Sequence, residues 1–200
     1  MLKKISVLTL CLFMLGLGFS ALAQDSNQRL KFTVVALSKE SDIRHSFENE
    51  LVKNLKANQY NAVASHLLIA DLPDFSKPDV YKRLREKGIQ GVLLLMPIDV
   101  GEQASIKSAQ QRVWSTTYDS IEAFVNGYRG GNFNTQAVVQ VSGFLITDNK
   151  SSNFWQGVIW LDDTVKTRQE GIEKLSGLVL SNLNASRAYL RKLLGLEPLN

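Results

Sequence analysis

Two histidines and a nearby glutamate are the first residues in this 200-residue sequence whose types could do chemistry. Glu48 follows His45 by three positions, which on a helix places the two side chains about one turn apart. On a shared face they could hold a metal ion, because imidazole and carboxylate are both zinc ligands. The competing interpretation is a solvated helix surface, and no HExxH or CxxC spacing accompanies His45 or His66. The sequence therefore predicts neither a metal site nor a cofactor.

The sequence also lacks the usual settings of a catalytic nucleophile. A serine hydrolase commonly presents its serine on a GxSxG turn, which is absent, and Ser142 falls in the middle of an expected strand. Three glycines could suggest a phosphate-binding loop, but no lysine follows them and no buried strand precedes them. They are Gly127, Gly130 and Gly131, and their pattern favours a flexible connection. We therefore predict no catalytic residue.

A stretch rich in aromatic residues, 99–134, is the strongest candidate for recognition. It is too long for a plain connector between packed elements, and loops of this length are usually functional or disordered. Its large apolar side chains argue against a solvated tail, which leaves two interpretations: a core-filling flap or a binding surface. The candidate binding surface comprises Trp114, Tyr118, Phe124, Tyr128, Arg129 and Phe133.

The elements that would position these residues begin with an alternation of strands and helices. An apolar, β-branched run predicts a strand over 30–37, and apolar residues spaced by four predict a helix over 42–57. We expect a second strand over 61–68 and a second helix that starts with a capping box at 76–79. The apolar run 91–96 is typical of a central strand buried on both faces. Crossovers of this length favour parallel pairing of the three strands.

The second half of the chain has a different order. Strands are expected over 135–147 and 154–161, joined as an antiparallel hairpin, and a short helix is possible over 117–126. A capping box at 167–170 opens a long helix that runs to about Leu194. Together these elements predict a single α/β domain with a mixed five-stranded sheet: three parallel strands with crossover helices, then the antiparallel hairpin. We expect helices to cover mainly one side of the sheet, with a long C-terminal helix.

The amino terminus has the pattern of a cleavable export signal. Lys3 and Lys4 precede an apolar run, and small residues close the run before Gln24. A membrane anchor needs about 20 apolar residues, and this run ends earlier. A lipid anchor at Cys11 is disfavoured, because a leucine precedes the cysteine and the apolar run continues past it. The expected organisation is a signal peptide at 1–23, a flexible segment at 24–29, one domain over 30–195 with the insertion at 99–134, and a tail at 196–200.

Cleavage would change both the charge and the cysteine content of the chain. The full sequence has 23 basic and 19 acidic residues, a net charge of +4. Lys3 and Lys4 leave with the signal, so the net charge of the remaining chain falls to +2. A chain with so small a positive charge is not expected to bind nucleic acid. The one cysteine, Cys11, leaves as well. Stability must then come from an ordinary hydrophobic core, because no disulfide can form.

The order of these segments resembles a known group of proteins. The segments are VVALS, SFENELVKNLKANQYNAVAS, LREKGIQGVLLLMPIDV, the aromatic insertion and VSGFLITDNKSSNFWQGVIW. Over residues 30–190 they are similar to a family of uncharacterised small bacterial envelope proteins, many of them lipoproteins. More distantly, they resemble the amino-terminal domain of the translocation protein TolB and the lipoprotein activators of penicillin-binding proteins. The resemblance implies a binding or accessory role in the periplasm, although this chain departs from the lipoprotein members by lacking a lipobox.

From these observations we expect an exported envelope protein that acts in the periplasm as a non-enzymatic binding or accessory factor. Its partner would be an envelope protein or a cell-wall component. The sequence predicts neither nucleic-acid binding nor a transmembrane anchor after cleavage, and it leaves the oligomeric state open. The alternative is a small periplasmic hydrolase whose site has no recognisable motif. A histidine that meets a serine and a carboxylate in a cleft would favour this alternative.

Overall fold

The computed structural model describes residues 30–69, 71–77, 79–98, 118–128, 133, 138–147, 150–160 and 166–193. The chain divides into two units whose residues contact mainly one another. One unit is Arg29–Leu190, and the other is made of Met1–Gln28 and Arg191–Asn200. The expected signal peptide and tail belong to the second unit and lie outside the described residues. The described helices and strands belong to Arg29–Leu190, apart from the last three residues of one helix.

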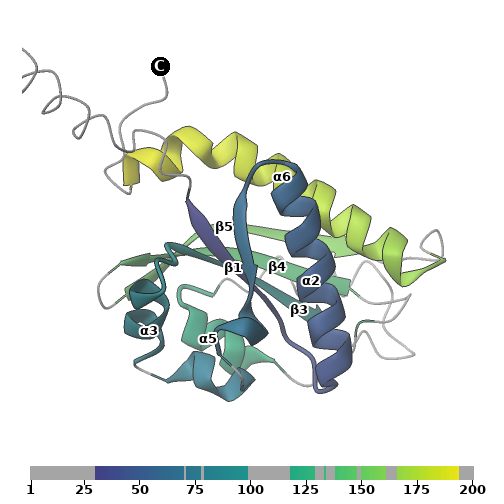
Figure 1. The fold of residues 1–200 in the computed structure, drawn as a ribbon, viewed down its shortest axis with the longest axis horizontal. Helices are drawn as coiled ribbons and strands as arrows, with labels where there is room; N and C mark the ends of the chain where they lie inside the picture. Colours follow the sequence, from purple (N-terminus) through teal and green to yellow (C-terminus); the bar gives the residue numbers. More distant parts are fainter. Residues whose placement is uncertain are drawn as a thin grey trace, which may run out of the picture. The chain divides into compact units, whose positions relative to one another are not determined.

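A five-stranded sheet forms the centre of the Arg29–Leu190 unit, with its strands in the order β2-β1-β3-β4-β5 (Figure 1). The strands are β1 (Lys31–Ala36), β2 (Asn61–Ala64), β3 (Gly91–Ile98), β4 (Val138–Thr147) and β5 (Lys150–Trp160). β1 pairs in parallel with both β2 and β3, whereas β3 with β4 and β4 with β5 are antiparallel. The predicted α/β fold, with a mixed five-stranded sheet and a C-terminal helix, is confirmed.

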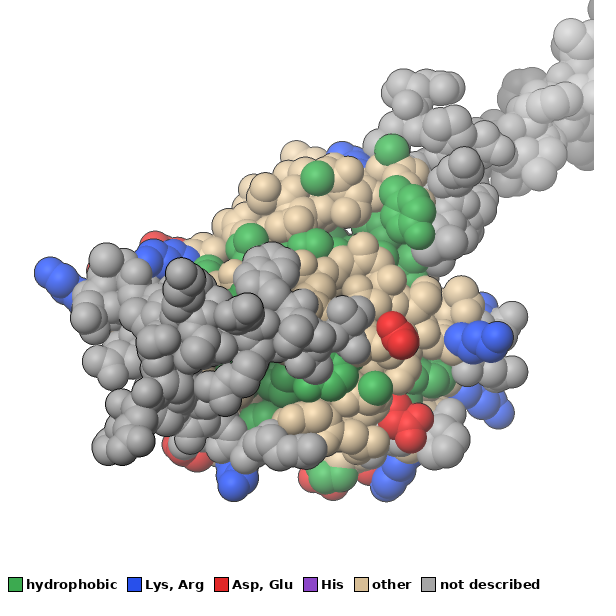
Figure 2. All heavy atoms as spheres, turned by 180° about the vertical axis from the view of Figure 1, so that it is seen from behind, with side chains coloured by type: hydrophobic (Ala, Val, Ile, Leu, Met, Phe, Trp, Pro, Cys, Tyr) green, Lys and Arg blue, Asp and Glu red, His purple; other side chains and the backbone are tan. Residues whose placement is uncertain are grey.

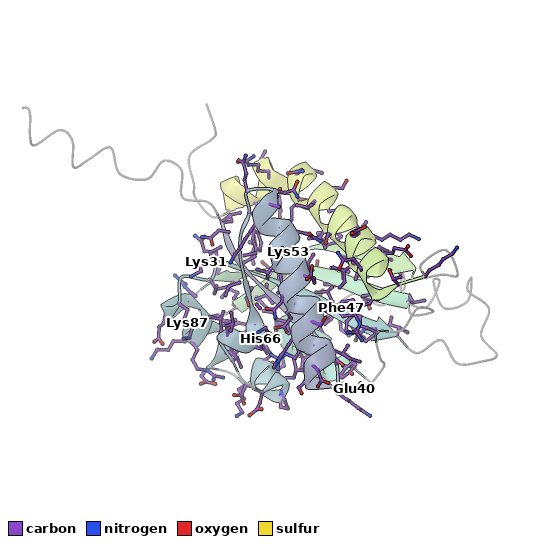
Figure 3. All side chains as sticks on the ribbon, turned by 45° about the vertical axis from the view of Figure 1, so that its right-hand side comes forward. Lys31, Glu40, Phe47, Lys53, His66 and Lys87 are labelled. Carbon is purple, nitrogen blue, oxygen red and sulfur yellow. The ribbon has the colours of Figure 1, made fainter. Side chains whose placement is uncertain are left out.

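The helix after β1, α2 (Ser41–Ala57), turns an apolar face towards the sheet. Phe47, Leu51 and Leu55 on this face are at most 3% exposed. The side chain of Lys53, in contrast, is 71% exposed (Figure 3). The spacing by four residues that predicted this helix therefore marks its buried side.

β2 is shorter than the sequence suggested. It ends at Ala64, because the chain turns into a 3-10 helix, η1 (Ser65–Leu67). The turn directs the hydroxyl of Ser65 to the buried carboxylate of Glu48, 2.6 Å away. An alternating apolar pattern could not show that a buried hydrogen bond would end the strand there.

The helix expected from a capping box at 76–79 also starts late. A 3-10 helix, η2 (Leu72–Ser76), occupies the preceding residues, so α3 begins only at Val80 and ends at Glu86. Asp79, at its N-cap, makes no side-chain capping hydrogen bond. The capping-box prediction is therefore wrong here.

β3 starts after a tight reversal of the chain. Gly88 follows α3 with a φ of 73°, a left-handed conformation that glycine adopts without steric cost. Seven of the eight residues of β3 are then buried, as expected for a central strand. Gly91 lies directly against the ring of Phe32 in β1, and a Cβ at Gly91 would overlap that ring. The neighbouring aromatic residue therefore requires glycine at this position.

β4 and β5 form the expected antiparallel hairpin, with one irregularity. Gly143 pairs with Trp155, and the next residue of β4, Phe144, pairs with Asn153. Phe154 is therefore an extra residue in β5, which makes a β-bulge. Residues 135–137 of the expected strand lie outside the described residues.

The long C-terminal helix, α6 (Arg168–Leu193), begins at the predicted capping box. The Glu170 N–H donates to Thr167 Oγ1, and the Thr167 N–H donates to Glu170 Oε2, both at 3.2 Å. Its buried stripe also follows the prediction, with exposures of at most 1%: Ile172, Leu175, Val179, Leu183 and Leu190. Among the helices of the described residues, none is long and apolar enough to cross a membrane.

Helices cover both faces of the sheet, which corrects the expectation of helices mainly on one side (Figure 1). α3 and α5 (Ile121–Gly127) pack over a core that includes Val92 of β3 and Phe144 of β4. α2 and α6 lie together on the other face, where Asn54 Nδ2 donates to Ser176 Oγ at 3.1 Å. β2 and β3 flank β1 on opposite sides, so right-handed crossovers in opposite directions carry their helices to opposite faces.

Candidate functional site: a pocket at the carboxyl edge of the sheet

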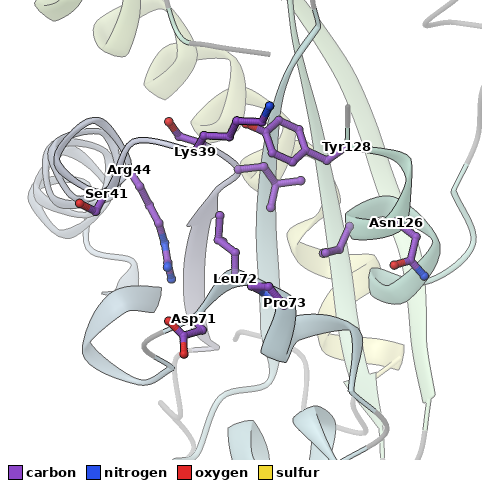
Figure 4. Close-up of a pocket in the computed structure, with 11 residues that line it drawn as sticks. Lys39, Ser41, Arg44, Asp71, Leu72, Pro73, Asn126 and Tyr128 are labelled. Atoms are coloured by element: carbon purple, nitrogen blue, oxygen red, sulfur yellow. The ribbon is translucent and has the colours of Figure 1, made fainter. Parts of the chain in front are cut away.

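A pocket opens beside the carboxyl end of β1 and the start of α2 (Figure 4). Its volume of about 580 Å³ falls within the range of about 300–1,000 Å³ typical of small-ligand sites. Three segments supply its walls: the turn between β1 and α2, the start of η2, and the end of α5. These segments are far apart in the sequence, so only the fold brings them together.

The topology of the sheet explains why a pocket forms at this place. β1 and β3 are neighbours in the sheet, and the chain leaves them in opposite directions. From β1 it continues to β2, on the side of β1 away from β3, and from β3 it continues to β4, on the side of β3 away from β1. Adjacent parallel strands whose connections diverge leave a crevice beyond their carboxyl ends. Proteins with open α/β sheets commonly bind their ligands in such a crevice.

The lining combines apolar surface with a few polar groups. Leu37, Leu72 and Pro73 supply apolar surface, and Lys39 and Asp71 stand on different walls (Figure 4). Neither Lys39 nor Asp71 makes a side-chain ion pair with any residue of the described part. Apolar walls with a small number of placed polar groups are typical of pockets that bind and orient a ligand.

Tyr128 connects the wall made by α5 to the turn after β1. Burial raises the pKa of the Tyr128 phenol, a hydrogen bond from the backbone of Lys39 lowers it in part, and the Glu40 carboxylate raises it further. The ring is half-buried, so it closes one side of the pocket while part of it stays in contact with solvent. This residue therefore ties the aromatic insertion to the start of α2.

Next to the pocket, the carboxylate of Glu48 is fully buried and accepts hydrogen bonds on both oxygens. Oε1 accepts from the Ala36 N–H at 3.1 Å, from Arg44 Nε at 3.0 Å and from Ser65 Oγ at 2.6 Å. Oε2 accepts from the His66 N–H at 3.0 Å and lies 2.8 Å from His66 Nδ1. Since a carboxylate can only accept, the ring nitrogen is the donor. The carboxylate thus joins β1, α2 and η1.

The same network holds Arg44, which lines the pocket. Its side chain is 5% exposed, and Nη2 donates to Ser65 Oγ at 2.9 Å and to the Ile69 carbonyl at 3.2 Å. A buried ion pair persists only where its remaining polar atoms also find partners. These bonds therefore make the guanidinium a fixed part of the wall.

The network brings together a serine, a histidine and a carboxylate, so it tests the hydrolase alternative directly. Ser65 is fully buried and donates to Glu48, while Arg44 donates to Ser65. In a nucleophilic triad the serine would bond to the histidine and would be open to substrate. Here the serine and His66 both bond to the carboxylate instead. This arrangement supports the turn after β2 and is not the geometry of an acyl-transfer site.

His45 and Glu48 do not share a face as a metal pair would. His45 is exposed, and its ring stacks on that of His66 with centroids 4.2 Å apart. Glu48 points into the protein, so the solvated-surface interpretation describes His45 and fails for Glu48. Within the described ranges no group of three or more His, Cys, Asp and Glu residues could hold a metal ion.

Two residues of the candidate binding surface belong to the hydrophobic core. Phe124 is fully buried and meets the half-buried Tyr118 edge-to-face, with centroids 5.1 Å apart. Phe133 is 6% exposed and packs on Phe47 of α2, with centroids 4.2 Å apart. For Phe124 and Phe133 the burial is what the core-filling interpretation expects.

The other residues of the candidate binding surface have different positions. Tyr128 lines the pocket, and Trp114 and Arg129 lie outside the described residues. The short helix expected over 117–126 is α5, which starts at Ile121 behind Ser120, whose hydroxyl accepts from the Ala123 N–H at 3.1 Å. Recognition by the whole insertion stays a prediction. Of its described residues, Val125, Asn126 and Tyr128 line the pocket.

Sequence reasoning missed the buried network, although a signal was present. Arg44 and Glu48 fall on the same helical stripe as Leu51 and Leu55, which the apolar period assigns to the core. Charged residues are rarely buried unless they are paired, so two of them at such positions, four residues apart, indicate a buried ion pair. Lys39 and Asp71 gave no such signal, because the pocket joins them only in the folded chain.

Comparisons with known proteins report a distant structural neighbour. No protein-family model matches the chain, and no curated protein matches it. Among solved structures, a PelC dodecamer from Paraburkholderia phytofirmans is similar over 80% of this chain and 90% of that chain. The sequence identity is 12% and the TM-score is 0.36, a level of similarity that says nothing about function.

Proposed function

We propose that this protein is exported to the periplasm and acts there as a non-enzymatic binding or accessory factor, with the pocket as its binding site. The observation that supports this most is the position of α5. This helix belongs to the aromatic insertion, and its end forms one wall of the pocket at the carboxyl edge of β1. The segment whose composition suggested recognition thus meets the edge where α/β proteins usually bind ligands.

The chemistry of the pocket favours binding over catalysis. The acidic and nucleophilic groups next to it, Glu48 and Ser65, are buried and bonded to one another. The polar groups that face the pocket, such as Lys39, Asp71 and Asn126, are of the kind that orient a bound group. The partner we infer is an envelope protein or a cell-wall component that inserts a side chain or terminal group with both apolar and polar parts.

A comparison of three forms of the protein tests this proposal. The chain is exported with its own signal and a C-terminal tag, then used to capture partners from envelope extracts and to co-sediment with insoluble cell wall. The double variant Lys39→Ala/Asn126→Ala should retain about a tenth of the bound partner, a loss of about 1.4 kcal/mol. The control Lys53→Ala, at a site on α2 that is 71% exposed and outside the pocket lining, should bind as the wild type does.

Two outcomes would contradict the proposal. Equal capture by all three forms would show that the pocket is not the binding site. Turnover of simple ester or amide substrates by the purified wild type, lost in the pocket variant, would favour a hydrolase instead.

A further inference from the structure

The charged groups that line the pocket differ in whether the protein balances their charge. Nε of Arg44 lies 3.0 Å from Oε1 of Glu48, so the guanidinium is matched by a buried carboxylate. Lys39 and Asp71 are exposed, and neither side chain forms an ion pair with any described residue. Within the described part of the chain, the pocket therefore presents one cation and one anion that have no partner of opposite charge.

The position of Lys39 and Asp71 distinguishes them from other charged residues at the surface. On the face shown in Figure 2, Lys and Arg side chains stand mainly at the margins, where solvent surrounds them. Lys39 and Asp71 instead line one pocket from two walls, with Leu72 between them in the close-up (Figure 4). A ligand in the pocket would therefore meet both charges and the apolar surface between them.

Hydrogen bonds of the backbone keep the two walls apart. Ser38 Oγ accepts from the Glu40 N–H at 3.2 Å, across the turn that carries Lys39. The Asp71 carbonyl accepts from the Asp74 N–H at 3.1 Å, which ties Asp71 to the first turn of η2. The backbones of the two charged residues thus stay on separate walls. A ligand that enters the pocket does not have to break an ion pair between them.

The two unmatched charges restrict the kind of ligand that the pocket can take. Covering a charge without a partner costs free energy, and a hydrogen bond to an opposite charge recovers it. A ligand with only a carboxylate would pair with Lys39 and leave Asp71 unmatched, and a ligand with only an amine would do the reverse. A peptide with free ends satisfies both residues, because its ammonium and carboxylate are separated by about 3.3–3.6 Å of backbone per residue. The volume of about 580 Å³ suits a short peptide.

We propose that the pocket binds a short peptide with free ends, whose carboxylate pairs with Lys39 and whose ammonium pairs with Asp71. The inference rests on the proposed function, because it names the class of ligand for the same pocket. Apolar side chains of the peptide would lie against Leu37 and Leu72, and its backbone would offer hydrogen bonds to Asn126.

Isothermal titration calorimetry of the exported protein with alanine tetrapeptide tests this assignment. The peptide is supplied in four forms: with both ends free, N-acetylated, C-amidated, and blocked at both ends. The form with free ends should bind the wild type. Blocking either end should weaken binding at least about tenfold, because each block removes a charge-assisted hydrogen bond.

Two variants assign each end of the peptide to one wall. Lys39→Gln should bind the free and the amidated peptide equally well and should still distinguish the acetylated one. Asp71→Asn should show the reverse pattern. The matched controls are Lys53→Gln and Asp119→Asn, both at exposed residues outside the pocket lining. Both controls should bind all four peptides as the wild type does.

Failure of this inference can be distinguished from failure of the proposed function. Equal binding of all four peptides by the wild type, or the wild-type pattern in both pocket variants, would overturn the assignment of the peptide ends. So would the absence of binding of the free peptide at millimolar concentration. The proposed function stands in each of these cases if Lys39→Ala/Asn126→Ala still reduces partner capture.

Discussion

Glu48 and His66 are joined twice: the backbone N–H and the ring Nδ1 of His66 both donate to Oε2 of Glu48, at 3.0 and 2.8 Å. The two residues are 18 positions apart, so this contact fixes η1 against α2. The other oxygen of Glu48 accepts from the N–H of Ala36 at the end of β1. The buried carboxylate of Glu48 therefore holds the end of β1, and the turn that follows β1 forms one wall of the pocket.

Replacing Glu48 with glutamine should strongly destabilise the protein. The amide keeps the shape of the side chain but removes the charge that pairs with Arg44, whose side chain is 5% exposed. Breaking one partner of a buried ion pair leaves the other charge uncompensated and typically costs about 3–5 kcal/mol. Urea unfolding should show this loss in the free energy of unfolding.

The matched control for this change lies on the same helix. Glu50→Gln removes a glutamate whose side chain is 33% exposed and which pairs with Lys53 at 3.3 Å. Surface pairs of this kind contribute little, so the free energy of unfolding should change by less than about 1 kcal/mol. Equal effects of Glu48→Gln and Glu50→Gln would mean that the buried network does not support the fold.

Gly91→Ala should also destabilise the protein, for a purely steric reason. The added Cβ would overlap the ring of Phe32, and overpacking in a tight core typically costs about 1–3 kcal/mol. The control is Gly177→Ala in α6, where nothing lies within 4 Å of the new Cβ. That change should stabilise the helix by about 0.5–1 kcal/mol. Thermal unfolding of both variants measures the two effects, and a stable Gly91→Ala would show that Phe32 moves aside freely.

How far the sequence predicted the fold depended on the range of the interactions. The buried run in β3 and the capping box of Thr167 and Glu170 are local patterns, and both were predicted correctly. The start of α3 was missed, because Ser76, the residue expected to cap the helix, is the last residue of η2, and α3 begins only at Val80. The early end of β2 depends on a hydrogen bond from Ser65 to a residue 17 positions away.

The site was less predictable than the fold for the same reason. Tyr128 was identified from its aromatic setting, but its hydrogen bond to the Lys39 backbone joins segments that are far apart in the sequence. Phe124 and Phe133 belong to the same aromatic-rich stretch as Tyr128, yet their side chains lie in the hydrophobic core. Aromatic residues have large apolar area in either role, so composition alone does not separate a pocket residue from a core residue.

The wild type should lose stability relative to Tyr128→Phe at alkaline pH. Burial raises the pKa of Tyr128 above its ordinary value of 10.0, so the folded protein holds the phenolic proton more tightly than the unfolded chain does. This stabilisation is fully present below the unfolded pKa and is lost as the pH rises through the folded pKa. Urea unfolding of both proteins at neutral pH and above pH 10 measures the change in their difference. Tyr189→Phe, at a residue that is 57% exposed, is the control, and identical behaviour of the two variants would contradict the prediction.

The combined variant Trp114→Ala/Tyr128→Ala tests whether the aromatic insertion carries recognition. Tyr128 lines the pocket and is only half-buried, so its loss removes contact surface without opening a large core cavity. We expect partner capture from envelope extracts to fall sharply while the melting temperature stays nearly unchanged. Phe124→Ala is the opposite case: its side chain is fully buried, and the cavity should cost about 3–5 kcal/mol. If the double variant unfolds as Phe124→Ala does, or still captures its partner at full strength, then the insertion serves the core and recognition lies elsewhere.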